Sequence, residues 1–517
     1  MKIKISPKKH IIFFIFLIFY FVFSVIFYKD FGPTSDEWTE RRASENLVRY
    51  LSQPTTFATM TDSDYRDPID YQLGHHPLVT KYQRSYQLMQ FVLNPKGYYE
   101  WDHLFNLAFG SLYFILGYTV FYIAYKSVWK SLLAVLFLAI TPRIVGDIPA
   151  NSKDMPFATM YLASLAVIYM FSVQKHNTYV KIFVLGSIFG LMQTFRTVGF
   201  SIYVVYLLYY FYLFWTSRVN FDKRKIFNFL AELLIIGIFS LFVSISIFPW
   251  LGANFYANFL ALLLDAKEYQ NWDDTIFFNG EFLSKSERPW YYLYTWIFIT
   301  TPVFILSMLG AFPIFIKRLF KDKLFSILFI ALIVNLSLYT FLQPVIYNGL
   351  RHFLYLLPTL VLISAIIFIN LLDSIKKPIY RFVLILLLAL NTGTVIYNFV
   401  TLHPYQYIYF NELIGGLSGA SGKYDFDYWG ATYKEATEWL VENKELTHEN
   451  FIRPCNNTFS IDYYSRREFF LTYGDHSKAT HTICDVDIER KLNLNGNVLY
   501  EVKRQGVVLN RVWENER

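Results

Sequence analysis

The sequence predicts an α-helical polytopic membrane protein, with about eleven transmembrane helices and a small extracytoplasmic α/β domain at the C-terminus. Of the 517 residues, 54% are hydrophobic and only 17% are charged, a composition outside the range of soluble globular proteins. Apolar runs of membrane-spanning length recur between short basic tracts. The remaining polar residues gather in two long loops and a C-terminal tail, and the tail accounts for the predicted domain.

The first apolar run covers residues 11–28 and reads IIFFIFLIFYFVFSVIFY, close to the roughly 20 residues that cross a bilayer. It is longer than the hydrophobic region of a secretory signal, and no small-x-small cleavage site follows it. We therefore expect a permanent anchor. Four basic residues precede this run and keep the N-terminus cytoplasmic by the positive-inside rule: Lys2, Lys4, Lys8 and Lys9.

Ten further runs complete the prediction, and the flanking charges set its orientation. The spans are expected at 11–28, 104–125, 128–142, 156–173, 182–196, 199–215, 227–249, 291–316, 324–343, 352–372 and 382–400. Nineteen Lys or Arg residues fall in the N-terminus and the loops on the cytoplasmic side, whereas the short outer loops hold only Arg143, Lys153, Arg196 and Arg351. This asymmetry predicts a multi-pass protein of the inner (plasma) membrane with its C-terminus outside. The runs 128–142, 182–196 and 199–215 are short, so tilted or partly re-entrant segments are the alternative there.

Three polar regions are expected outside the membrane. Loops 29–103 and 250–290 belong to a membrane module over 1–400, and the tail forms a separate domain over 401–517. No internal period of 20–50 residues recurs, which argues against a repeat architecture.

The tail carries patterns of both helix and strand. Residues 432–446 place Ala436, Trp439 and Leu440 on one face, which predicts a helix. Residues 497–513 alternate in polarity around Arg504-Gln505-Gly506, which predicts a hairpin. The two cysteines, Cys455 and Cys484, form either a disulfide or a pair of buried thiols.

The first candidate for chemistry is the acidic pair Asp36 and Glu37, which follows the first span by only a few residues. Thr34-Ser35-Asp36-Glu37 fits a capping box, in which the Glu37 side chain accepts a hydrogen bond from the backbone of Thr34. An ordinary helix start is the alternative reading. The position at the outer membrane–water boundary favours a function.

The second candidate is the loop TPRIVGDIPANSKDMPF at 141–157, which packs four charged residues between two apolar segments: Arg143, Asp147, Lys153 and Asp154. Charges this close to the bilayer core usually have partners or a function. In the alternative reading, Asp154 caps the next helix and pairs with Lys153.

The third candidate is NGLRHFLYLLP at 348–358, where Arg351 and His352 lie at the outer end of a span. A guanidinium there suits a phosphate, because its planar fork binds oxygens bidentately. An arginine that snorkels to the interface is the alternative. His75 and His76 in the first loop point in different directions on any regular element and make a poor metal pair.

With these motifs assembled, the chain resembles the GT-C glycosyltransferases that take sugars from polyprenyl phosphate, in the branch of protein O-mannosyltransferases and aminoarabinose–lipid A transferases. The shared pattern is an acidic pair after the first span, an Asp-bearing outer loop between spans three and four, a late outer arginine before a proline-containing helix, and an outer C-terminal domain. SERPWYYLYTWIFITTP, NGLRHFLYLLP and GGLSGASGKYDFDYWGATYKEATEWL resemble a bacterial subgroup of phospholipid-carrier-dependent glycosyltransferases. The resemblance covers most of the chain and is weakest over 440–517.

This resemblance implies transfer of one sugar, with inversion, from a polyprenyl-phosphate donor to a lipid, glycan or protein acceptor at the outer face. It implies Asp36 as the catalytic carboxylate beside Glu37, and Asp154 or Asp147 as a second acidic contribution. Arg351, helped by Lys153, would hold the carrier phosphate, and His352 and His75 are further candidates. It gives no role to Asp427-Tyr428-Trp429-Gly430.

Several alternatives stay open. A divalent metal ion could bind Asp36, Glu37 and Asp154 through their oxygens. A lipid-linked oligosaccharide ligase or polymerase would share this architecture, and a receptor-like scaffold is a further class. A secondary transporter would share the hydrophobicity, but the missing repeats and the long outer tail argue against it. The net charge of +7 sits in short tracts between spans, which topology requires, so nucleic acid is not an expected partner.

Overall fold

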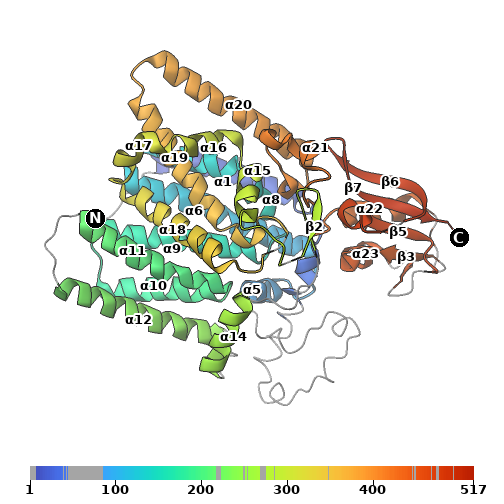
Figure 1. Ribbon diagram of the computed structural model, residues 1–517, viewed down its shortest axis with the longest axis horizontal. Coiled ribbons are helices and arrows are strands. Elements are labelled where there is room, and N and C mark those ends of the chain that lie inside the picture. Colours follow the sequence, from blue (N-terminus) through green and yellow to red (C-terminus); the bar gives the residue numbers. More distant parts are fainter. Residues whose placement is uncertain are drawn as a thin grey trace.

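A computed structural model describes residues 7–44, 85–216, 223–247, 251–267 and 275–516, with short gaps at 39, 42–43, 253, 285, 347, 445, 447–449, 467, 473–476 and 493. Figure 1 shows helices packed together over most of the chain and a smaller region of strands and helices at the C-terminal end. His75 and His76 lie outside the described residues, so their place relative to the site stays a prediction.

Helices occupy all eleven predicted positions. Ten of these positions carry one helix each: α1 (Ile11–Phe27), α6 (Tyr99–Tyr125), α7 (Val128–Ala139), α9 (Asp154–Val173), α10 (Thr178–Gln193), α11 (Ser201–Thr216), α12 (Lys223–Ile247), α18 (Lys323–Leu342), α19 (Leu356–Ser374) and α20 (Pro378–Leu402). Among the described residues, eight helices are individually long and apolar enough to cross a membrane. The predicted polytopic α-helical membrane fold is therefore confirmed, whereas α7 and α10 are shorter than a full span.

The prediction of one continuous span over 291–316 is wrong. The segment divides into α15 (Tyr292–Thr300) and α16 (Val303–Gly310), which meet at an angle of 116°, and α17 (Phe312–Leu319) follows. The break lies at Thr301-Pro302, where Thr301 is extended with a ψ of 133°. A proline removes a backbone donor and pushes the preceding residue out of the helical region, which explains the break.

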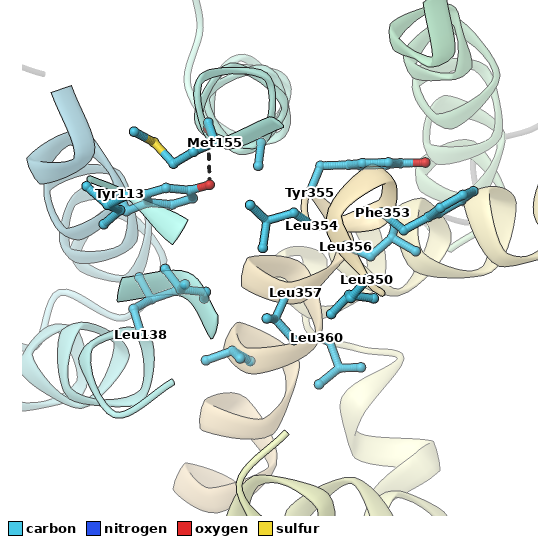
Figure 2. Close-up of a cluster of buried hydrophobic side chains, with 14 of the residues drawn as sticks. Tyr113, Leu138, Met155, Leu350, Phe353, Leu354, Tyr355, Leu356, Leu357 and Leu360 are labelled. Atoms are coloured by element: carbon cyan, nitrogen blue, oxygen red, sulfur yellow. Dashed lines mark hydrogen bonds between the residues drawn. The ribbon is translucent and has the colours of Figure 1, made fainter. Parts of the chain in front are cut away.

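Helix α19 forms the centre of the membrane module. Of its most apolar stretch, 83% is buried, compared with 17% for α12 and for α20, whose apolar side chains face outward where lipid would lie. Figure 2 shows the start of α19, with Leu357 on the side of Tyr113 and Leu138, and Leu356 on the side of Phe353. The Tyr113 hydroxyl donates to the Met155 carbonyl at 3.2 Å, so this core position satisfies its polar atom.

Shorter elements lie before, between or after the long helices. The helices are η1 (Pro7–His10), α5 (Ser85–Leu93), α8 (Pro142–Asp147), η4 (Thr197–Phe200), α14 (Phe255–Lys267), η5 (Arg351–Phe353), η6 (Gln406–Ile408), η7 (Glu412–Ile414) and α21 (Gly416–Ala420). The strands β1 (Ile276–Phe278) and β2 (Glu281–Leu283) pair antiparallel in the second long loop. Helix α8 packs against η6, which brings the 141–157 loop next to the start of the C-terminal tail.

The C-terminal region is a five-stranded mixed sheet in the order β4-β3-β5-β7-β6, with helices beside it (Figure 1). Its elements are α22 (Tyr433–Asn443), β3 (Phe451–Pro454), α23 (Thr458–Tyr464), β4 (Phe470–Leu471), β5 (His481–Asp485), α24 (Val486–Glu489), β6 (Gly496–Arg504) and β7 (Val507–Asn515). The predicted helix and hairpin are both present. Gln505 and Gly506 take positive φ angles of 49° and 79°, which a two-residue hairpin turn favours.

Cys455 and Cys484 form a disulfide between the end of β3 and β5, which resolves the open choice. The bond closes a loop with a sequence separation of 29, for which the chain-entropy model gives about 3–4 kcal/mol. The double variant C455S/C484S is expected to lower the unfolding temperature of the C-terminal region, measured by scanning fluorimetry and by trypsin sensitivity of 401–517. A stability equal to that of the wild type would contradict this expectation.

The segment that follows α1 is held against the C-terminal region. The Ser35 backbone N–H donates to the Trp429 carbonyl at 3.0 Å, and Asn457 Nδ2 donates to the Pro33 carbonyl at 2.8 Å. Trp38 stacks on Phe459 with centroids 3.9 Å apart. A Cβ at Gly32 would come within 2.3 Å of a backbone carbonyl oxygen, so only glycine fits this approach. The tail therefore helps to position the residues that follow the first span.

Candidate functional site

The structure joins the two residues on which the sequence argument depends. Arg351 Nη1 donates to Asp36 Oδ2 at 2.6 Å, although the residues are 315 positions apart. The Arg351 side chain is 8% exposed and the Asp36 side chain 39% exposed, so the pair is open on the carboxylate side. A charge-assisted contact of this kind is strong, and its exposed edge can exchange partners with a ligand.

The loop before Arg351 is braced from two sides. Gly349 has a φ of +76°, and its N–H donates to the Tyr292 hydroxyl at 2.9 Å. Arg288 donates to the Ile346 and Pro344 carbonyls at 2.8 and 2.6 Å. The segment SERPWYYLYTW, which contains Arg288 and Tyr292, therefore holds the arginine loop in place. The short 3₁₀ turn η5 then presents Arg351 to the segment that follows α1.

Glu37 faces away from this pair. Its Oε2 accepts from the Thr34 N–H at 2.7 Å, as the capping box predicts, and its Oε1 lies 3.0 Å from His103 Nε2. Glu37 also borders a small polar hollow with Glu40, Arg41, Gln90, Phe91, Asp102 and Ser152. In this structure Glu37 caps the helix that carries Asp36, whereas Asp36 alone of the two contacts Arg351.

Asp154 opens α9 and forms an ion pair with Arg196, which lies between α10 and η4. The predicted alternative, in which Asp154 caps α9 and pairs with Lys153, is wrong. Asn151 Oδ1 instead accepts from the Asp154 N–H at 2.8 Å, and Lys153 Nζ lies 3.5 Å from Glu40 Oε1. Asparagine in an outer loop is a common cap and left no distinctive signal in the sequence.

His352 lies near the cations of the site. Burial and the charges of Arg196, Arg351 and Lys153 lower the pKa of His352 well below its usual value, so its ring is neutral at physiological pH. The histidine thus marks where the Asp36–Arg351 and Asp154–Arg196 pairs and Lys153 come near one another. A site with three basic side chains of this kind can bind a phosphate.

Asp147 is buried on α8, with 2% of its surface exposed, and Asn151 Nδ2 donates to it at 3.2 Å. Burial raises the pKa of Asp147 to about 7, although Arg143 and Asn151 act in the opposite direction. The carboxyl therefore takes up or releases a proton near neutral pH. It senses the charges of Asp154 and Arg351, which places both predicted loop aspartates around the same cluster.

Asp147→Asn is expected to stabilise the protein, and increasingly so as the pH rises. In the folded protein burial raises the pKa of Asp147 from its ordinary 3.8 to about 7, so wild-type stability falls as the pH rises between these values. Three pKa units correspond to about 4 kcal/mol. The unfolding temperature of D147N should match the wild type near pH 4 and exceed it at pH 8. The matched control is the exposed Asp462→Asn, and an effect of D147N that is independent of pH would contradict the prediction.

Tyr428 and Trp429, to which the family resemblance assigns no role, lie beside Arg351. The Arg351 guanidinium carbon lies 5.9 Å from the Tyr428 ring centroid and 6.0 Å from that of Trp429. Asp427 accepts from the Tyr407 and Thr432 hydroxyls and from the Ala431 N–H, which fixes the turn that presents them. The DYWG segment could have been noticed as aromatic residues in an outer loop, but its partners come from distant parts of the sequence.

The three suggested metal ligands point to different partners: Asp36 to Arg351, Glu37 to Thr34 and His103, and Asp154 to Arg196. Across the part of the chain that the structure describes, no group of three His, Cys, Asp or Glu side chains is arranged to hold a metal ion. The arrangement instead pairs carboxylates with guanidinium groups, which suits a ligand that carries both a phosphate and hydroxyl groups.

No protein-family model and no curated protein sequence matches the chain. Solved structures match it in fold. ArnT from Cupriavidus metallidurans bound to undecaprenyl phosphate aligns with 96% of this chain and 98% of its own, at a TM-score of 0.53 and 11% identity. The same ArnT in the apo state aligns with 96% of this chain and 97% of its own, at a TM-score of 0.51 and 11% identity. The oligosaccharyltransferase AglB from Archaeoglobus fulgidus aligns with 89% of this chain and 66% of its own, at a TM-score of 0.45 and 12% identity. The predicted GT-C-like fold is confirmed by ArnT along almost the whole chain.

Proposed function

We propose that this protein is an integral membrane glycosyltransferase that moves a sugar from a polyprenyl-phosphate donor to an acceptor at the outer face of the membrane. The observation that carries the proposal is the Asp36–Arg351 contact at 2.6 Å. It joins Asp36, the candidate base, to Arg351, the candidate residue for binding the donor phosphate. A second acidic residue, Asp154, and the cations Arg196 and Lys153 lie around the same cluster. The ArnT fold, one structure of which contains undecaprenyl phosphate, supports the same reading.

The proposed reaction begins when the donor phosphate takes the place of Asp36 on Arg351. Arginine binds phosphate oxygens bidentately, so the exchange is favourable where Arg196 and Lys153 add positive charge. Asp36 is then released beside the anomeric carbon. An ion-paired carboxylate is a weak base, and loss of its partner strengthens it, so donor binding would prepare the base for its task.

In the transfer step the acceptor oxygen, or nitrogen, attacks the anomeric carbon from the face opposite the phosphate. The bond between that carbon and the phosphate oxygen breaks, and the polyprenyl phosphate leaves with the electron pair. The acceptor proton passes to Asp36. Arg351 stabilises the negative charge on the leaving phosphate, and the low dielectric at the membrane edge strengthens this effect. The configuration of the sugar is inverted.

The substrate and the topology follow from the same arrangement. A monosaccharide on an undecaprenyl- or dolichyl-type carrier is the proposed donor, and a lipid, glycan or protein is the acceptor. The N-terminus would lie in the cytoplasm and the 401–517 domain outside, in the inner (plasma) membrane, as the Lys and Arg distribution predicts.

Mass spectrometry of polyprenyl-linked sugars in cells with and without the protein tests this function. Loss of the protein is expected to leave a monosaccharide on the carrier and to remove that same sugar from the cell surface. Accumulation of a preassembled oligosaccharide would instead assign a ligase. Unchanged carrier lipids and surface glycans would contradict both.

A further inference from the structure

Arg143 is a buried cation that the proposed reaction does not use. It is 1% exposed, and its Nε and Nη2 atoms have no hydrogen-bond partner in the described part of the chain. The same residues supply no carboxylate within 4.0 Å of it. Its guanidinium carbon lies 5.6 Å from the ring centroid of Trp296 and 5.9 Å from that of Phe410. Two aromatic rings thus hold the charge in place but do not accept its N–H groups.

The other arginines near the site, all more exposed than Arg143, differ from it in having acceptors. Arg351 is paired with Asp36, Arg196 with Asp154, and Arg288 donates to backbone carbonyls. A buried guanidinium whose N–H groups lack acceptors is unfavourable, and buried charges in proteins are normally paired with a partner of opposite charge. The cation–π contacts do not by themselves explain why Arg143 is buried, because such contacts also form at exposed positions.

Two further donors without acceptors lie beside Arg351. The Tyr428 hydroxyl and the Trp429 indole N–H are buried and have no hydrogen-bond partner among the described residues. Burial and the charge of Asp147 raise the pKa of Tyr428, whereas the charges of Arg143 and Arg351 lower it, so the phenol lies near both arginines. A Cβ on Gly349 would lie 3.5 Å from Tyr428 and 3.7 Å from Trp296, so the aromatic residues beside each arginine meet at the Arg351 loop.

We propose that Arg143, with the Tyr428 hydroxyl and the Trp429 indole N–H, forms a second oxyanion position next to the phosphate position at Arg351. The proposal rests on the proposed function and extends it, because it assigns the substrates a second acidic group, a phosphate or a carboxylate. That group is either the second phosphate of a diphosphate carrier or an acidic substituent of the sugar or acceptor.

Binding of three probes to the full-length protein in nanodiscs tests this inference: undecaprenyl phosphate, undecaprenyl diphosphate, and inorganic phosphate added to protein saturated with undecaprenyl phosphate. If the carrier supplies the second anion, the wild type should bind the diphosphate at least about 10-fold more tightly than the monophosphate, and Arg143→Met should abolish the difference. If the sugar or acceptor supplies it, the wild type should bind the added phosphate and R143M should not.

The unfolding temperature separates this role from a structural one. Without ligand, R143M should melt at the wild-type temperature or above it, because it loses no hydrogen bond. Tyr428→Phe, which removes only the hydroxyl, should weaken the same binding with an intact fold. Arg490→Met is the matched control: Arg490 also lies over a ring, Phe277 at 4.9 Å, but pairs with Asp487.

The inference is overturned if R143M binds every probe like the wild type. It is also overturned if R143M has a lower unfolding temperature but unchanged binding. The third such result is a wild type that binds the two lipids equally and does not bind the added phosphate. A wild type that binds neither lipid would overturn the proposed function, and this inference with it. Normal binding of undecaprenyl phosphate with no effect of R143M would overturn this inference alone.

Discussion

Asp36→Asn is expected to lower the rate of sugar transfer by about 10²–10⁴-fold, the usual contribution of a positioned general base. The amide keeps the shape of the side chain and a hydrogen-bonding oxygen for Arg351, but it cannot take the acceptor proton. Binding of undecaprenyl phosphate should stay within a factor of about 3, because the loss falls on the chemical step. Transfer is measured as release of polyprenyl phosphate by the purified protein.

A nearby aspartate provides the control for this substitution. Asp30 lies six residues earlier on the same outer segment and contacts His403 Nε2 at 2.8 Å, outside the proposed site. D30N should therefore transfer sugar like the wild type. Unimpaired turnover of D36N would remove Asp36 from the mechanism, whereas an equal loss in both variants would point to a general disturbance of the outer segment.

Arg351→Met is expected to weaken binding of undecaprenyl phosphate by about 30-fold or more. Removing one member of a buried hydrogen-bonded charge pair costs about 2–5 kcal/mol, and here the ligand phosphate would lose its main partner. Arg351→Lys keeps the charge but not the planar fork, so its affinity for undecaprenyl phosphate should lie between those of the wild type and R351M. Binding is measured by calorimetry in nanodiscs.

Arg318 serves as the matched control, since it too lies near a carboxylate, Asp373 at 4.0 Å, but on the side predicted to be cytoplasmic. R318M should bind the lipid like the wild type. Wild-type affinity in R351M with an unchanged unfolding temperature would mean that the phosphate binds elsewhere.

Much of the fold could be predicted because bilayers impose simple rules on sequence. Length and hydropathy located helices at every expected position, and alternation around Gly506 predicted the C-terminal hairpin. The break at Thr301-Pro302 was missed because proline also occurs in continuous membrane helices, where neighbouring segments satisfy the freed carbonyl. Composition therefore could not show whether this proline bends the chain.

The site was only partly accessible from the sequence. Asp36, Asp154 and Arg351 stood out as charges at span ends, and the structure brings all three near His352. Arg196 was counted only as an outer-loop cation, because its pairing with Asp154 depends on how α9 packs against α10. Likewise, Tyr428 and Trp429 reach the cluster only through the way the C-terminal tail folds back on the first outer segment.

A cryo-electron microscopy structure of the full-length protein with undecaprenyl phosphate tests the central claim most directly. We predict that the phosphate lies within hydrogen-bonding distance of Arg351, with Asp36 released from the guanidinium and facing the position of the sugar. Phosphate density at a separate surface, with the Asp36–Arg351 pair intact, would contradict the account.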